Sequence, residues 1–177
     1  MNPPAESSNS NRSASALPYP DNKPVGAGDF YFAINATFAF LHRKFGLNGL
    51  QRYWEALGQN YHAPVSARWR SGGLPAVAEY WRAFFAAEPG AEVEVKADPE
   101  EVAVEVRVCP AIQHLRAHRR EILACFCQHC YFVGEAMAAG ADLTMRVEGG
   151  NGACRQTFRR RDPALPLQNL ARIKEAA

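Results

Sequence analysis

Two stretches of this chain alternate apolar and polar residues with a period of two, and a helical pattern separates them. Residues 92–108 have the sequence EVEVKADPEEVAVEVRV, in which valines alternate with charged residues on both sides of a turn at 98–100. Residues 143–160 repeat the alternation around a glycine-rich turn at 149–152. Because successive side chains of a strand point to opposite faces, each stretch predicts an antiparallel hairpin with one dry and one wet face. Two such hairpins favour a sheet that helices cover on one face.

Apolar residues recur at helical spacing before and between the hairpins. This spacing predicts helices over 30–45, 48–61 and 75–88, a loop over 62–73, and helical structure over 110–137 with a break near 118–120. The prediction is therefore an α+β fold, with an antiparallel sheet of about four strands in two hairpins, covered by helices.

Composition shifts at both ends predict the domain limits. Residues 1–25 are polar and rich in proline, serine and asparagine, which is typical of a disordered tail. Residues 26–161 are predicted to form a single α+β domain. Prolines after Asp162 end the last strand, so residues 162–177 are predicted to be a C-terminal extension with a short helix.

The overall balance of residue types excludes several classes of partner. The chain has 177 residues, 47% hydrophobic and 21% charged, with a net charge of +2. This charge is too small to indicate binding to nucleic acid or to a membrane surface. The start lacks the pattern of a secretory signal, and no apolar run is long enough to span a bilayer. We therefore expect a cytoplasmic protein, whose five cysteines are free thiols, metal ligands or redox groups.

Cys109 is predicted to lie where a strand ends and a helix begins. Pro110 suits the first helical position, which makes Cys109 the N-cap. The free N–H groups and the positive end of the helix favour a thiolate there, so the pKa of Cys109 is expected to fall towards neutrality and the sulfur to become nucleophilic. A small residue tolerated at a corner is the simpler interpretation of the same position.

Cys127 and Cys130 form a C-x-x-C motif in the following helical stretch. With Cys109 and Cys154 they make a set of four ligands, or of three with His129, that suits zinc or an iron–sulfur cluster. Cys130 also fits the apolar side of the helix, and cysteine is often simply buried. The sequence leaves a metal site and a buried core position as alternatives.

The last predicted strand places Cys154 and Gln156 on its inward face. A buried glutamine needs partners for its amide, so Gln156 is expected either to face a pocket beside Cys154 or to bond to backbone. Gly149 and Gly150 allow the preceding turn, and their N–H groups would be able to approach a ligand. A turn alone also explains these glycines.

Three segments together resemble the L-2-amino-thiazoline-4-carboxylic acid hydrolase family of small bacterial proteins. They are VEVRVCP, a helix that carries FCQHC, and the turn EGGNGACRQTF. The family pattern has a Cys-Pro after a strand, a cysteine in the next helix and a glycine-then-cysteine hairpin, which fall here on Cys109-Pro110, Cys127, Gly149-Gly150 and Cys154.

The resemblance implies hydrolytic opening of a cyclic C=N bond in a thiazoline or amidine, with no cofactor required. In this hypothesis the Cys109 thiolate attacks the ring carbon and His129 or a water moves protons. Arg68 or Arg155 would hold the substrate carboxylate. The wider predicted site includes the catalytic candidates Cys154 and Gln156 and the substrate-binding candidates Gly149 and Gly150.

Three functions follow from these observations. The first is a thiol-dependent hydrolase of a small molecule. The second is an accessory or sensor protein that holds zinc or an iron–sulfur cluster on Cys109, Cys127, Cys130 and Cys154. The third is a non-catalytic domain that binds an apolar ligand between its aromatic helices. The sequence also leaves open a homo-oligomer or a partner protein.

Overall fold

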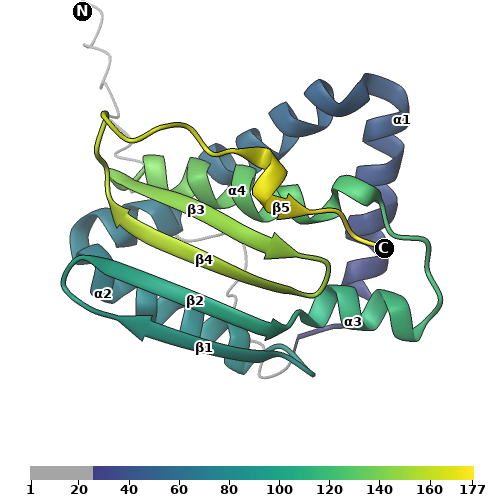
Figure 1. The fold of residues 1–177 in the computed structure, drawn as a ribbon, viewed down its shortest axis with the longest axis horizontal. Helices are drawn as coiled ribbons and strands as arrows, with labels where there is room; N and C mark the ends of the chain where they lie inside the picture. Colours follow the sequence, from purple (N-terminus) through teal and green to yellow (C-terminus); the bar gives the residue numbers. More distant parts are fainter. Residues whose placement is uncertain (1–25) are drawn as a thin grey trace, which may run out of the picture.

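The computed structural model describes residues 26–177, so the predicted disordered tail lies outside the described residues. One sheet has the strand order β1-β2-β4-β3-β5 (Figure 1). Its strands are β1 (Glu92–Ala97), β2 (Glu101–Val108), β3 (Leu143–Gly150), β4 (Ala153–Arg160) and β5 (Ile173–Lys174). Neighbours pair antiparallel, except that β5 runs parallel to β3. The α+β class and both hairpins are confirmed, and β5 adds a strand that periodicity did not indicate.

Helices cover one face of this sheet, and among residues 26–177 no helix covers the other face (Figure 1). The helices against the sheet are α2 (Ala63–Ala86) and α4 (Gln128–Ala139), and α1 (Phe30–Ala56) packs on α4. A π-helical turn, Leu57–Tyr61, joins α1 to α2. Within residues 26–177, none of the helices combines the length and the apolar character that a bilayer crossing requires.

The loop predicted over 62–73 is wrong, because these residues form the first half of α2. The helix bends at Gly73, whose φ of 61° favours a residue without a Cβ atom. The bend allows Pro75 to begin the second half, since a proline inside a straight helix would remove a hydrogen bond. Arg68, which the sequence placed in a mobile loop, therefore lies on a helix.

The connection between the hairpins is divided where the sequence predicts a break. Helix α3 (Pro110–Ala117) ends before Arg119, which has a positive φ of 52°. A 3-10 turn, Ala124–Cys127, then leads directly into α4.

The segment 162–177 packs onto the sheet. Its short helix is a 3-10 turn, Leu170–Arg172, which precedes β5. Ile173 and Ala176 are both 5% exposed, so this end of the chain buries side chains of its own.

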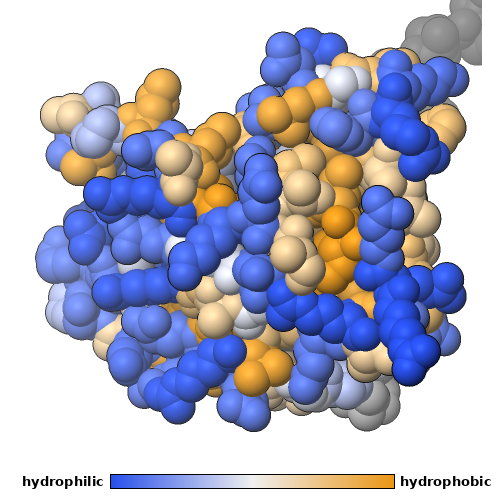
Figure 2. All heavy atoms as spheres, turned by 45° about the vertical axis from the view of Figure 1, so that its right-hand side comes forward, coloured by the Kyte–Doolittle hydropathy of each residue, from blue (hydrophilic) through white to orange (hydrophobic). Residues whose placement is uncertain are grey.

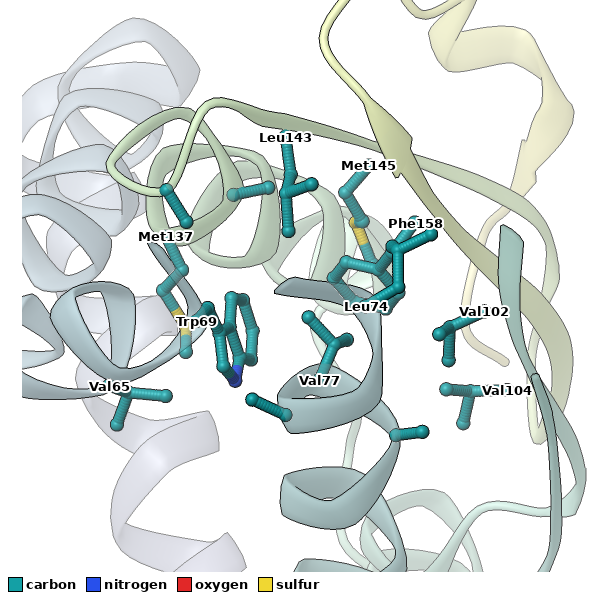
Figure 3. Close-up of a cluster of buried hydrophobic side chains, with 14 of the residues drawn as sticks. Val65, Trp69, Leu74, Val77, Val102, Val104, Met137, Leu143, Met145 and Phe158 are labelled. Carbon is teal, nitrogen blue, oxygen red and sulfur yellow. The ribbon is translucent and has the colours of Figure 1, made fainter. Parts of the chain in front are cut away.

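The larger hydrophobic core fills the space between the sheet and helices α2 and α4 (Figure 3). Trp69 of α2 meets Phe158 of β4 edge to face, with ring centroids 5.6 Å apart. Strands β2, β3 and β4 contribute their inward residues, among them Val102, Val104, Leu143 and Met145. The alternation in both hairpins thus places one set of side chains in this core.

A smaller core lies between α1, α3 and the start of α4, around Phe38, Trp54 and Phe126. Figure 2, which turns this side forward, shows apolar atoms exposed between hydrophilic ones. Cys109 and Cys127 pack against both cores. These two cysteines therefore lie at the seam where the two cores meet.

We expect Phe158→Ala to lower the free energy of unfolding by about 3–5 kcal/mol, because the lost ring leaves a cavity against Trp69. Phe158 is fully buried, whereas Leu167 is 89% exposed, so Leu167→Ala should change the same quantity by less than about 0.5 kcal/mol. Urea unfolding followed by tryptophan fluorescence measures both variants. Equal stability of the two variants would contradict this assignment of the core.

Candidate functional site

Cys109 stands at the corner between β2 and α3, as the sequence predicts. Its backbone is extended (φ −78°, ψ 117°), and Pro110 occupies the first turn of α3, so Cys109 is the N-cap. Its N–H donates to the oxygen of Gly152 over 2.8 Å, which ties the corner to the β3–β4 hairpin. The N–H groups of Ala111 and Ile112 favour a charge on the sulfur, although the side chain makes no capping hydrogen bond.

Cys127 and Cys130 lie where α4 begins. The backbone N–H of Asn151, at the hairpin tip, donates to Sγ of Cys127 over 3.3 Å. Sγ of Cys130 lies 3.7 Å from Nε2 of His129. Within the C-x-x-C motif, Cys127 therefore contacts the hairpin and Cys130 contacts the imidazole of His129.

Cys154 approaches the same region from β4, where it pairs with Val106 on one side and Gly149 on the other. Nε2 of Gln156 donates to Sγ of Cys154 over 3.7 Å, and Gln156 is 5% exposed. A Cβ atom at Gly149, which has a φ of 89°, would come within 2.7 Å of the oxygen of Ala153. Glycine is thus required where the two strands approach each other at Cys154.

The four cysteines interact electrostatically across these elements. A negative charge on Cys130 raises the pKa of Cys109, of Cys127 and of Cys154. The fold therefore brings near one another four cysteines that are spread over 46 sequence positions, from Cys109 to Cys154. We call these four residues the thiol site.

Burial governs the ionisation of the thiol site. It raises the pKa of Cys109 to about 11, of Cys127 to about 12 and of Cys130 to about 11, and it also raises the pKa of Cys154. The expected fall of the Cys109 pKa towards neutrality is wrong, because desolvation outweighs the helix N-terminus and the charge of Arg116. All four thiols are therefore protonated at neutral pH.

His129 faces the smaller core and forms a pair with Cys130. Its Nδ1 bonds to the carbonyl oxygen of Phe126, so this nitrogen carries the hydrogen and Nε2 is left as an acceptor for the Cys130 thiol. Its ring packs against Phe38 and Trp54, with centroids 5.4 and 6.4 Å away. Burial lowers the pKa of His129, which keeps the imidazole neutral.

Tyr31 lies beside the thiol site and is hydrogen-bonded to Glu88, although the sequence did not single out either residue. The Tyr31 hydroxyl, from the first turn of α1, donates to the carboxylate of Glu88. Burial raises the pKa of Tyr31, the hydrogen bond to Glu88 adds to this effect, and charges on Cys109 and Cys130 contribute. The sequence carries no signal for Tyr31, because it lies among several aromatic residues at helical spacing.

Neither arginine that the sequence proposed as a substrate ligand reaches the thiol site. Arg68 is engaged in an exposed ion pair on α2. Arg155 pairs with Glu101 at 2.8 Å and with Glu105 at 3.2 Å. Since neighbouring residues of a strand face opposite sides, Arg155 lies on the open face of the sheet, away from Cys154.

Gly150 and Cys125 serve the packing around the site. A Cβ atom at Gly150 would come within 2.5 Å of the oxygen of Lys174, so glycine allows β5 to approach β3. Cys125 packs against the smaller core, and burial and then the charge of Glu175 raise its pKa.

Within residues 26–177, no three His, Cys, Asp or Glu side chains converge closely enough to hold a metal ion as they stand. No protein-family model, curated protein or solved structure matches the chain. The resemblance to the thiazoline hydrolases therefore stays a prediction.

We expect the free energy of unfolding to fall as the pH rises above about 9. The pKa of Cys127 rises from 9.0 to about 12 in the fold, so in this interval the unfolded chain releases a proton that the folded chain keeps. The loss approaches about 1.4 kcal/mol per pH unit for one thiol. Urea unfolding in the presence of a reductant, repeated at several pH values, measures this loss of unfolding free energy.

Two variants isolate the contribution of Cys127. In Cys127→Ala the alkaline loss of stability should be smaller than in the parent, whereas in Cys125→Ala it should be closer to the parental value. A pH dependence that Cys127→Ala leaves unchanged would show that this thiol ionises normally in the fold.

Proposed function

We propose that the thiol site binds a soft metal ion or an iron–sulfur cluster, and that the chain is an accessory or sensor protein built around it. The observation that carries this proposal is the set of N–H donors directed at the sulfurs. Asn151 donates to Cys127, Gln156 donates to Cys154, and the N-terminus of α3 lies against Cys109. Donors of this kind stabilise thiolate ligands and tune the potential of thiolate-bound centres.

The buried position of the site favours ligation over a free thiolate. A thiol with a pKa of about 11 is ionised in roughly one molecule in ten thousand at pH 7. A bound cation compensates the buried negative charge and deprotonates the thiols that coordinate it. The raised pKa values thus describe a site that is neutral when empty and acquires its thiolates together with the metal.

The chemical nature of the ligands limits the choice of metal. A site of sulfur ligands selects zinc, copper(I) or an iron–sulfur cluster over magnesium or calcium, which prefer oxygen. Because the side chains do not converge as they stand, binding requires the thiols to turn towards a common centre.

Metal titration tests the proposal directly. Apo protein prepared anaerobically should bind Co²⁺ or Zn²⁺ at about one ion per chain, with thiolate-to-cobalt absorption and release of protons. The double variant Cys127→Ser, Cys130→Ser should lose this binding. Iron–sulfur reconstitution, followed by iron and sulfide analysis, tests the cluster in the same variants.

Cys125→Ser is the matched control, because it removes a thiol of the same chain that lies outside the thiol site. It should bind metal as the parent does. Apo protein that takes up neither ion nor cluster, and whose melting temperature does not respond to either, would overturn the proposal.

The hydrolase remains a second candidate, because Cys109 does occupy a helix N-terminus and Arg116 supplies a nearby positive charge. The family resemblance supports opening of a thiazoline ring, although the two arginines first considered for the substrate carboxylate lie elsewhere. Arg116, by contrast, lowers the pKa of Cys109 through its charge, so Arg116 is a better candidate than Arg68 or Arg155 for that role.

Incubation with L-2-amino-thiazoline-4-carboxylate tests this candidate. A hydrolase should convert it to a product heavier by one water molecule, with chelator present throughout, and Cys109→Ser should abolish turnover by removing the nucleophile. Mass spectrometry follows substrate and product, and Cys125→Ser again serves as the control. Turnover that survives Cys109→Ser excludes Cys109 as the nucleophile.

A further inference from the structure

Residues 166–177 run along the free edge of β3 towards the side of the molecule that holds α3 (Figure 1). The side-chain amide of Gln168 bonds both to the N–H and to the oxygen of Val147, each over 3.1 Å, as a neighbouring strand would. Next, β5 pairs with Gly149 and Gly150. The segment 166–174 is therefore anchored to the edge of the sheet by the side-chain amide of Gln168 and by the short pairing of Ile173 and Lys174 with β3.

The last residues of this segment meet the hairpin tip beside the thiol site. The N–H of Ala177 donates to Oδ1 of Asn151 over 2.9 Å. Arg116 of α3 donates to the oxygen of Ala177 over 2.9 Å through Nε and over 2.6 Å through Nη2. Arg116 also bonds to the oxygen and to the side chain of Asn151. Residues 116, 151 and 177 thus form one hydrogen-bonded junction, which we call the latch.

The latch holds the hairpin tip against the sulfur of Cys127 and against the backbone of Cys109. The backbone N–H of Asn151 donates to Cys127, and the oxygen of the next residue, Gly152, accepts from Cys109. One residue before the latch, the N–H of Ala176 donates to the oxygen of Ala124, in the turn that leads to Cys127. Moving the tip away from the latch would therefore separate it from the Cys127 sulfur and from the corner that carries Cys109.

The latch is held by surface contacts. Arg116, Asn151 and Ala177 make their mutual bonds at exposed positions, where each hydrogen bond competes with water. The flanking β3–β4 pairs and the buried Ile173 anchor the structure on both sides. Opening has to break these exposed hydrogen bonds and to withdraw one small apolar side chain, that of Ala176, from the smaller core.

We infer that residues 175–177, held by Arg116 and Asn151, act as a gate that controls access of metal ions and thiol reagents to Cys109 and Cys127. For metal ions, this inference rests on the proposed function. For thiol reagents, it rests on the geometry alone. Opening of the gate separates the hairpin tip from α3 and leaves β5 paired.

Thiol labelling of the apo protein tests the gate without any metal. Asn151→Gly removes the side-chain acceptor of the latch and suits the local backbone, whose φ is 56°. We expect Cys127 to react with N-ethylmaleimide about tenfold faster in this variant, since roughly two exposed hydrogen bonds are lost. Peptide mass spectrometry after a timed quench gives the rate for each cysteine.

Two arginine variants form a matched pair. Arg116→Gln opens the latch, whereas Arg172→Gln removes only the exposed ion pair with Glu148 at the side of β3. Loss of the Arg116 charge by itself would slow the reaction of Cys109 by disfavouring its thiolate, so faster labelling of Cys109 in Arg116→Gln reports opening. Arg172→Gln should label within about twofold of the parent.

Release of bound Zn²⁺ to a chelator completes the test. Faster release from Asn151→Gly and Arg116→Gln than from Arg172→Gln supports the gate as a control of the metal site. If labelling accelerates but no metal binds at all, the gate stands and the proposed function fails. Labelling rates equal to the parent in both latch variants, with melting temperatures unchanged, overturn the gate.

Discussion

The tip of the β3–β4 hairpin is the contact on which the site depends. Its backbone supplies the acceptor for the N–H of Cys109 and the donor for the sulfur of Cys127, so one turn positions the starts of both α3 and α4. The turn follows this path through Gly149, Gly150, Asn151 and Gly152, all of which have positive φ. A side chain with a Cβ atom at most of these positions would strain the backbone or strike the neighbouring strands.

The location between two hydrophobic cores sets the chemistry of the thiols. Apolar surroundings make an isolated charge on sulfur unfavourable, and a charge on one thiol makes the next harder to ionise. The same surroundings would strengthen both the attraction between a bound cation and the thiolates and the hydrogen bonds that the N–H groups donate to those thiolates. A single physical cause, desolvation, thus weakens the free nucleophile, and under the proposed function it would strengthen thiolate–metal attraction.

Predictions that depend on residues close together in the sequence fared better than those that depend on contacts between distant residues. Both hairpins and the N-cap at Cys109 follow from spacing within about a dozen residues, where periodicity and proline chemistry decide. Residues 62–73 were predicted as a loop because a glycine and a proline usually end a helix. Here they only bend α2 at Gly73, and the helix continues beyond the bend. Alternation gives the face of the strand on which Arg155 lies, but not its partners Glu101 and Glu105, because these come from a different strand.

By itself, the sequence determined which residues alternate, where helices begin, and that Cys154 and Gln156 share the inward face of a strand, since each of these depends on neighbours along the chain. Only the tertiary structure decided that the four cysteines lie near enough to raise one another's pKa, that Tyr31 lies beside them, and that burial raises the pKa of the thiols. It also decided that residues 175–177 return to Arg116 and Asn151. These features depend on contacts between segments far apart in the chain, and on the desolvation that such contacts cause, for which no local pattern exists.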